Sequence, residues 1–262
     1  CDLADPAAIR RLVAEVAPQI IVNPAAYIAV DKAESEPELA QAINATAPGI
    51  LGQEAKKLGA LVVHYSTDYV FDGTKAGAYT EDDTPNPQSV YGKTKLAGEQ
   101  ALQQSGADHL IFRTSWVFGA HGGNFAKTML RLAAERDALK IVADQHGAPT
   151  SAALLADVTA QAIGRYQREG RASFPFGLYH LVAGGLTTWH AYAQTVVRAA
   201  EAAGKPLKVK ADDIAPIATT DYPLPAPRPA NSHLDTRRLQ ATFGLRLPDW
   251  QEGLDHVLQQ IL

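Results

Sequence analysis

The chain alternates short apolar runs with segments of helical periodicity, and this alternation constrains its fold more than any other feature. In the helical segments apolar residues recur every three or four positions, as Ile9, Val13 and Val16 do. The runs between them are short and rich in Ile, Leu and Val, which is typical of buried strands. Helices are predicted at 5–16, 38–58, 89–104, 152–166 and 189–203, and strands at 19–23, 61–63, 110–118 and 178–182. Because strands that alternate with helices form parallel βαβ units, we predict an α/β fold with a parallel sheet.

The last third of the chain departs from this alternation. Four prolines follow one another at every second position between 221 and 229. Proline cannot lie inside a helix or a central strand, so we expect an extended segment there. Tyr222, Leu224 and Trp250 lie nearby, and these large apolar residues indicate a packed lobe rather than a flexible linker.

Composition excludes several classes of protein. The net charge of -4 gives no reason to expect a nucleic acid or an anionic membrane as partner. No apolar run approaches the ~20 residues of a membrane span. The single cysteine, Cys1, excludes an intramolecular disulfide and is consistent with a reducing cytoplasm. The eight histidines have no cysteine partners and no H-E-x-x-H arrangement, so a structural zinc site is not expected.

A dinucleotide-binding sheet begins with a strand, a glycine-rich turn and a helix. Neither G-x-G-x-x-G nor G-x-x-G-x-x-G occurs in this sequence, and the glycines of 119–123 have the wrong spacing. The chain opens at Cys1. We therefore expect that the first strand–helix–strand unit of such a sheet is absent from this chain.

Tyr91 and Lys95 are four residues apart on a predicted helix and so share one face of it. The phenol of a free tyrosine has a pKa of ~10. A neighbouring ammonium favours the phenolate, so we expect Lys95 to lower the pKa of Tyr91. A tyrosine of this kind exchanges a proton with a carbonyl or an alcohol. Alone, the Y-x-x-x-K spacing is weak, because solvated helices carry it by chance.

Hydroxyl residues upstream strengthen this interpretation. Ser66 and Thr67 follow the short apolar run 61–63, at the end of a predicted strand. Ligands of parallel sheets gather at the carboxyl ends of the strands. A hydroxyl there and the Tyr91–Lys95 pair on the next helix would place a hydrogen-bond donor, a proton carrier and a cation in one crevice.

These residues resemble the extended short-chain dehydrogenase/reductase family. Further runs narrow the resemblance to the dTDP-4-dehydrorhamnose reductase family, and it extends from the first residues to the last. The runs are STDYVFDG at 66–73, VYGKTKLAGE at 90–99, FRTSWV at 112–117, NFAKTML at 124–130, DQHGAPT at 144–150 and RPANSHL at 228–234.

The resemblance implies a Rossmann-like, doubly wound parallel sheet with a smaller C-terminal substrate-binding lobe. It divides the chain into a dinucleotide-binding domain, residues 1–119 and 151–183, and a lobe, residues 120–150 and 184–262. The implied activity is reduction of the C4 keto group of dTDP-4-dehydro-L-rhamnose with NADPH or NADH. Alternatives are a nucleotide-sugar epimerase or dehydratase of the same family, or a non-catalytic regulatory subunit related to the reductase.

The resemblance also implies roles for single residues. Tyr91 would be the general acid, and Lys95 would lower its pKa and hold the cofactor ribose. Thr67 would bind the substrate carbonyl oxygen, with Ser66 as the competing hydroxyl. The implied cofactor contacts are Asp2, Leu3, Ala25, Ala26, Tyr27 and Tyr65, besides Tyr91 and Lys95. The implied substrate contacts are Asp68, Trp116, Asn124, Arg228 and Asn231, besides Thr67.

Several of these residues have structural alternatives. Asp2 could cap a turn, Asp68 could accept a turn hydrogen bond, and Tyr65 and Trp116 could be packed in the core. Asn44 is a helix asparagine of the kind the wider family places near the catalytic lysine, or else a simple cap.

Some relatives are thought to join subunits through carboxylates and a divalent ion. Glu252 and Asp255 could belong to such a cluster, but Ala153 stands where the resemblance requires another acid. We therefore predict no metal site. The family resemblance is the only ground for expecting a homodimer.

Overall fold

A computed structural model describes all residues from 1 to 262. The main sheet has four parallel strands in the order β1-β2-β3-β8. Its strands are β1 (Ile20–Asn23), β2 (Leu61–Thr67), β3 (His109–Thr114) and β8 (Gly177–His180). The helices that flank it are α1 (Pro6–Val16), α2 (Val30–Ala33), α3 (Pro37–Gln41), α4 (Ala47–Leu58), α5 (Val90–Gln104), α7 (Ala152–Glu169) and α9 (Arg237–Phe243). The predicted α/β fold with a parallel sheet is confirmed.

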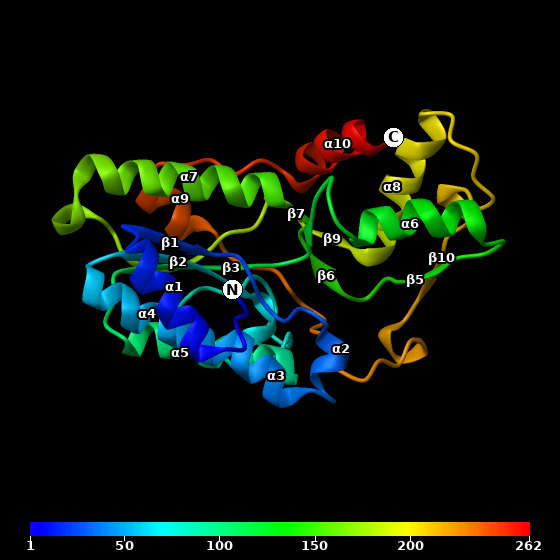
Figure 1. Cartoon of the computed structure of the whole chain (residues 1–262). Helices are drawn as coiled ribbons and strands as arrows, with labels where there is room; N and C mark the ends of the chain where they lie inside the picture. The colour runs from blue at the N-terminus through cyan, green and yellow to red at the C-terminus, as the bar shows by residue number, and fades with distance from the viewer.

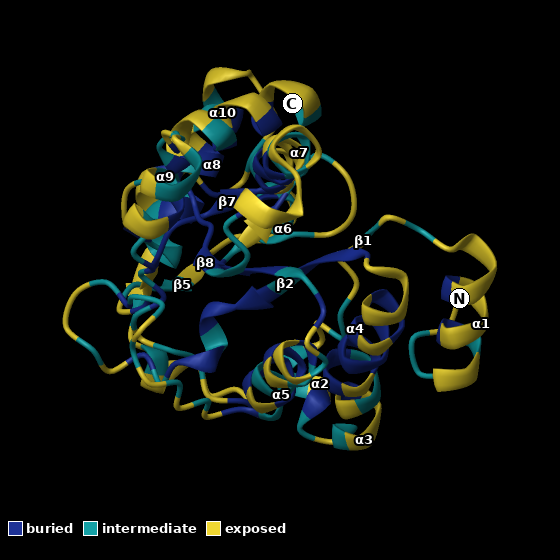
Figure 2. Cartoon of the chain, turned by 90° about the vertical axis from the view of Figure 1, so that its left-hand side faces the viewer, coloured by how far each residue is buried: buried dark blue, intermediate teal, exposed yellow.

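Helices cover both faces of this sheet, with α1, α4 and α5 on one side and α7 and α9 on the other (Figure 1). Residues of β2 alternate between the two faces. Leu61 and Val63 pack with apolar residues of α7, whereas Val62 packs against Ala55 of α4 and Leu102 of α5. Strands β2 and β3 are buried along almost their whole length, and β2 is mostly dark blue in Figure 2.

A second, smaller body lies beside the sheet and holds the C-terminus (Figure 1). Its helices are α6 (Phe125–Glu135), α8 (Trp189–Ala202) and α10 (Trp250–Ile261), and its short strands are β4 (Val117–Phe118), β5 (Lys140–Val142), β6 (His146–Gly147), β7 (Thr150–Ser151), β9 (Thr187–Thr188) and β10 (Ala215–Ile217). Its core is rich in aromatic residues, including Phe118, Tyr192 and Trp250.

The C-terminal segment does not stay within this body. Helix α9 returns to the sheet, where Leu239 and Leu247 join the core formed by β2, β3 and α7. Residues 237–247 of the segment expected in the lobe therefore pack with the sheet. The chain then crosses back to form α10 (Figure 1).

Two predicted elements are divided in the structure. The helix expected at 38–58 consists of α3, a π-helical stretch (Ala42–Thr46) and α4, and Pro48 lies in the first turn of α4, where proline is tolerated. The strand expected at 110–118 ends at Thr114, because Trp116 has a left-handed backbone with φ 49°. After this break β4 pairs with β7 of the smaller body.

No helix is long and apolar enough to cross a membrane.

Candidate active site

Helix α5 carries the Tyr91–Lys95 pair and lies unusually close to two other backbone segments. Ser89 caps its first turn by accepting a hydrogen bond from the Gly92 N–H at 3.1 Å. A Cβ atom on Gly92 would lie 2.2 Å from the Tyr69 carbonyl oxygen, and one on Gly98 would lie 2.0 Å from the Asn44 carbonyl oxygen. Only glycine permits this approach, so the main chain of the neighbouring segments fixes the position of α5.

Thr67 ends β2 and is buried. Its hydroxyl donates to Asp68 Oδ1 at 3.1 Å and accepts from the Tyr69 N–H at 3.2 Å, and it lies close enough to the Tyr91 phenol to influence its pKa. Ser66, one residue earlier, has a buried hydroxyl that makes no hydrogen bond. Of the two competing hydroxyls, the structure therefore places Thr67 beside Tyr91.

The expected lowering of the Tyr91 pKa is wrong. Burial raises the pKa of Tyr91 to about 12, opposed in part by the bond from Thr67 and reinforced by the charge of Asp68. The Lys95 ammonium, itself buried, donates instead to the carbonyl oxygen of Tyr65 at 2.6 Å. Burial also lowers the pKa of Lys95 to about 8, against the effect of Glu99.

Asp68 follows Thr67 and is only 3% exposed. Burial raises the pKa of its carboxyl to about 6, and hydrogen bonds oppose that shift. Its Oδ2 atom makes no geometric hydrogen bond. A buried carboxylate beside Thr67 and Tyr91 can accept a hydrogen bond from a hydroxyl group in the crevice.

The loop after β1 contains Ala25, Ala26 and Tyr27 and is tied to α5. Asn44, buried in the π-helical stretch, accepts from the Tyr27 N–H at 2.8 Å. Its Nδ2 group donates to the Tyr27 carbonyl at 3.1 Å and to Thr94 Oγ1, on α5, at 3.2 Å. Asn44 thus joins the predicted cofactor loop to the helix of the catalytic pair, and it is not a simple cap.

The other predicted cofactor residues are spread over the sheet domain. Asp2 accepts from the Ala4 N–H at 2.8 Å and so caps a turn, and Leu3 packs against the core between α1 and α4. The Tyr65 phenol lies 2.6 Å from Thr159 Oγ1 on α7. The main-chain carbonyl of Tyr65, rather than its ring, therefore contacts Lys95.

Trp116 lies between the sheet and the smaller body. Its indole stacks on Trp189, with ring centroids 3.7 Å apart. A Cβ atom on Gly147 would lie 2.6 Å above the same indole. Trp189 thus covers one face of the Trp116 ring, and Gly147 packs against its Cε2, Cζ2 and Nε1 atoms.

Asn124 and Asn231 use their side chains to hold loops. Asn124 caps α6 by accepting from the Lys127 N–H at 3.1 Å and donates to the Gly119 carbonyl at 2.7 Å. Asn231 donates to the carbonyls of Lys75 and Gly77 at 2.8 and 2.7 Å. Both N–H donors of Asn231 are used in this way, whereas one N–H of Asn124 stays available.

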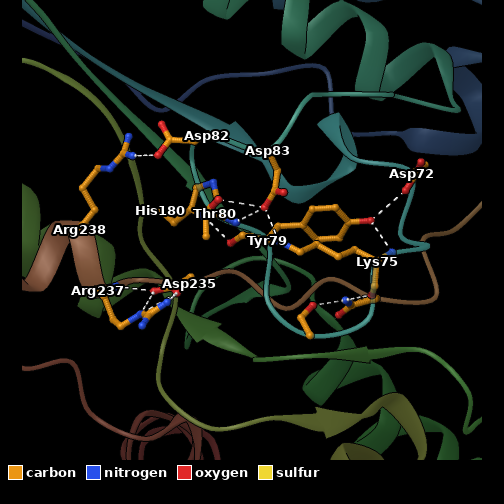
Figure 3. A network of polar contacts seen from close by, with 12 residues as sticks. Asp72, Lys75, Tyr79, Thr80, Asp82, Asp83, His180, Asp235, Arg237 and Arg238 are labelled. Carbon is orange, nitrogen blue, oxygen red and sulfur yellow. Dashed lines mark hydrogen bonds and ion pairs between the residues drawn. The ribbon is translucent and has the colours of Figure 1, made fainter.

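A larger network of polar contacts fastens the loop between Thr67 and Tyr91 (Figure 3). Asn231 joins this loop through the Lys75 carbonyl. The Tyr79 phenol donates to Asp72 at 2.8 Å, and Lys75 pairs with Asp83 at 2.5 Å. Arg238, on α9, pairs with Asp82. The loop that joins the two catalytic segments is therefore anchored to the C-terminal segment.

Arg228 links the extended proline-rich segment to the sheet domain. Its guanidinium pairs with Asp31, on α2, at 2.7 Å, and Asp31 also accepts from the Ala226 N–H at 3.2 Å. Arg228 lines a cavity of about 580 Å³ between this segment and the helices of the smaller body. The cavity is lined by apolar, aromatic, polar and charged side chains, among them Tyr69, Met129, Gln145, Trp189, Ile217 and Arg228.

Sequence reasoning missed two of these lining residues. Tyr69 meets the ring of Tyr91 edge-on at 5.4 Å and so joins the cavity to the proton donor. It lies within the STDYVFDG run, which was the available signal. Trp189 follows no recognisable pattern, because its place in the cavity depends on the packing of α8 against α6.

No group of three or more His, Cys, Asp or Glu side chains is arranged to hold a metal ion. Glu252 instead caps α10 together with Asp249.

The parallel sheet, the hydroxyl at the end of β2 and the Tyr91–Lys95 pair on α5 define an extended short-chain dehydrogenase/reductase. The family model for the RmlD substrate binding domain matches residues 1–262. The chain belongs to this family, that of the dTDP-4-dehydrorhamnose reductases.

Named relatives agree with that assignment. The dTDP-4-dehydrorhamnose reductase of Escherichia coli K12 is 52% identical over 260 residues, which cover 99% of this chain and 85% of that protein. A crystal structure of the Clostridium acetobutylicum reductase has a TM-score of 0.89 at 37% identity and covers 98% of this chain and 86% of that one. The Bacillus anthracis reductase in complex with NADP has a TM-score of 0.88 at 34% identity, over 99% and 86% of the two chains.

Proposed function

We propose that this protein reduces the C4 keto group of dTDP-4-dehydro-L-rhamnose to give dTDP-L-rhamnose, with NADPH or NADH as reductant. The observation that carries the proposal is the placement of Thr67, at the end of β2, beside Tyr91, in the first turn of α5 where Gly92 packs against the Tyr69 carbonyl. Two hydroxyl donors at one point suit a carbonyl oxygen that becomes an alkoxide during reduction. The identity to named reductases supports the choice of substrate.

The nicotinamide cofactor supplies a hydride to the keto carbon when it is bound. The residues of this chain fit its nicotinamide-ribose half. Ala25 and Ala26 are small and line the carboxyl end of β1, where a cofactor backbone can approach closely. Lys95 offers an ammonium that has three N–H donors.

Tyr91 acts on the substrate oxygen. With a pKa of about 12 the phenol is fully protonated at neutral pH, so it is ready to donate. Thr67 donates a second hydrogen bond to the same oxygen once its single hydroxyl proton turns from Asp68 to the substrate. Transfer of the phenol proton leaves a phenolate, which the positive charge of Lys95 stabilises across the helix face. Ionised Asp68 opposes phenolate formation, so it keeps the phenol protonated before the substrate is reduced.

The cavity of about 580 Å³ is the proposed place for the nucleotide end of the substrate. Its apolar and aromatic lining suits a base, and Arg228 suits a diphosphate because its planar fork pairs with oxyanions. We assign cofactor binding to residues 1–119 and 151–183, and substrate binding to the smaller body with Asp68. Trp116 would contribute its edge.

A cytoplasmic location agrees with the single exposed cysteine, and the homodimer stays a prediction. The acidic net charge supports the absence of a nucleic-acid partner.

The test is turnover of NADPH with dTDP-4-dehydro-L-rhamnose by the wild-type protein and by Tyr91→Phe. Loss of the proton donor should reduce kcat by about 10²–10⁴-fold. Tyr166→Phe is the matched control, since that tyrosine lies on α7 and packs against the core on the opposite side of the sheet from α5, so its change should leave kcat unchanged. A Tyr91→Phe protein with normal melting and undiminished turnover would exclude this mechanism. Absence of turnover by the folded wild-type protein would exclude the activity.

A further inference from the structure

His64 is a buried histidine to which the reaction described above assigns no role. It lies on β2, is 1% exposed, and faces the side of the sheet covered by α5. Its Nε2 atom lies 3.3 Å from Lys95 Nζ, and the side-chain amide of Asn23 lies 3.2 Å from its Nδ1 atom. Asn23 and His64 are direct neighbours in the register of β1 and β2.

These contacts form a continuous chain from the predicted cofactor loop to the catalytic pair. Asn23 is the last residue of β1 and immediately precedes the segment that contains Ala25 and Ala26. Lys95 Nζ contacts both His64 and the carbonyl of Tyr65. An ammonium has three N–H donors, so β2 takes two of them and leaves one for the crevice.

The protonation states follow from the donors and acceptors. An ammonium only donates, so Nε2 of His64 must be unprotonated when Lys95 is charged. Neutral His64 then carries its proton on Nδ1. The atom of Asn23 placed against Nδ1 is the amide nitrogen Nδ2, so this tautomer requires the Asn23 amide to be turned over so that its oxygen accepts that proton. Burial and the charge of Lys95 both lower the pKa of His64, which keeps the ring neutral.

The choice of an imidazole has a chemical consequence. A carboxylate at this position would form an ion pair and neutralise the ammonium. A neutral ring nitrogen accepts a hydrogen bond and fixes the direction of Nζ without cancelling its charge. The full positive charge therefore stays available to a phenolate and to the hydroxyls of a ribose.

We infer that His64, oriented by Asn23, is a positioning residue that holds the Lys95 ammonium in place for the nicotinamide ribose and for Tyr91. This inference takes the role of Lys95 from the proposed function. The geometry of the Asn23–His64–Lys95 contacts is independent of that function.

The first test compares His64→Leu, which removes the acceptor, with His64→Gln, whose amide oxygen can replace it. Because a hydrogen bond to a charged group is lost, we expect His64→Leu to weaken NADPH binding and to raise its KM by about tenfold or more. The KM for the dTDP-sugar should change by less than about twofold, since its proposed contacts are elsewhere. His64→Gln should recover most of the loss.

His180→Leu is the matched control. His180 is as deeply buried, lies on another strand of the same sheet, and contacts the Tyr79 carbonyl rather than Lys95. It should lose stability as His64→Leu does but keep the KM for NADPH. Equal effects of both variants on that KM, or no rescue by His64→Gln, would overturn the inference.

The second test does not depend on activity. NMR of the imidazole nitrogens in the wild-type protein should show neutral His64 with its proton on Nδ1. A proton on Nε2 would overturn the inference, even if His64→Leu does not fold. If the wild-type protein shows no turnover, the proposed function fails while this measurement still decides the positioning of Lys95.

Discussion

The interiors of the sheet domain and of the smaller body contain different kinds of side chain. Between the sheet and α5 the interior contains charged and polar groups, among them Lys95, Glu99 and Arg113. The core of the smaller body is formed by aliphatic and aromatic side chains such as Val196, Tyr192 and Trp250. A buried charge is stable only where its hydrogen-bond partners lie at the right distance and angle. An apolar core accepts a range of side-chain shapes as long as its total volume is kept. The sheet domain is thus suited to fixing a reaction, and the smaller body to accommodating a ligand.

The largest effect should come from breaking the buried pair of the sheet domain. Arg113 donates to both carboxylate oxygens of Glu99, at 2.9 and 2.7 Å, and both side chains are almost fully buried. Glu99→Gln leaves the guanidinium without its charge partner, so we expect a loss of about 3–5 kcal/mol in the free energy of unfolding. Chemical denaturation measures this loss.

The control is Glu135→Gln, which removes an exposed ion pair with Arg131 on α6. That change should cost no more than about 0.5 kcal/mol. Similar losses for the two variants would contradict the contrast between the bodies.

The second effect depends on pH. The folded pKa of Asp68, about 6, lies above its ordinary 3.8, so the folded state binds this proton more tightly than the unfolded state does. The corresponding stabilisation is present below 3.8 and is lost as the pH rises through 6. Asp68→Asn should therefore be more stable than the wild type at about pH 8, by up to about 3 kcal/mol.

Thermal melting of both proteins across this range tests the prediction. The advantage of Asp68→Asn should shrink as the pH falls through 6 and vanish near 4. An advantage that does not change with pH would refute the assignment. Turnover should fall in the same variant, because the buried carboxylate is a proposed substrate contact.

A smaller effect is expected in the aromatic body. Gly147→Ala would force a methyl group against the Trp116 indole, which Trp189 prevents from moving away. Overpacking of this kind should cost about 1–3 kcal/mol. Gly123→Ala is the control, because no atom lies within contact distance of a Cβ there. Equal melting temperatures for the two variants would show that the Trp116 indole can move to make room for the added methyl group, against this prediction.

The smallest effect should come from Ser66→Ala. The buried Ser66 hydroxyl has no hydrogen-bond partner, so its removal should be neutral or slightly stabilising, within about 1 kcal/mol. Turnover should stay within about twofold of the wild type, whereas Thr67→Val, which removes the catalytic donor, should lose about 10²-fold. A larger loss in Ser66→Ala would reverse the assignment of the two hydroxyls.

The sequence predicted the sheet domain better than the smaller body. The spacing of apolar residues located helices α5 and α7, and runs of Ile, Leu and Val located strands β1 and β2, each to within a few residues. These elements could be located because each buries a regular set of side chains. The break at Trp116 was not predicted, since a left-handed backbone at a tryptophan depends on its neighbours Gly147 and Trp189. The return of α9 to the sheet depends on tertiary contacts of Leu239 that no local pattern reveals.

The site shows the same limit. Tyr91 and Lys95 were predicted from their spacing and Thr67 from the family resemblance, and the structure places Thr67 beside Tyr91. The pKa of Tyr91 was predicted in the wrong direction, because burial cannot be read from an i, i+4 pair. Asn124 and Asn231 resemble family positions, yet their amides hold loops, and only the folded chain reveals which carbonyls lie within their reach.

The close contacts of α5 at Gly92 and Gly98 have a consequence for how such enzymes diverge. Two carbonyl groups of the main chain fix the helix, and main-chain atoms do not change when residues mutate. Specificity can therefore drift through substitutions in the neighbouring body while the proton donor stays in place. The same contacts make these two glycines the positions where a single added methyl group would displace the whole helix, so selection should preserve them even though neither takes part in the chemistry.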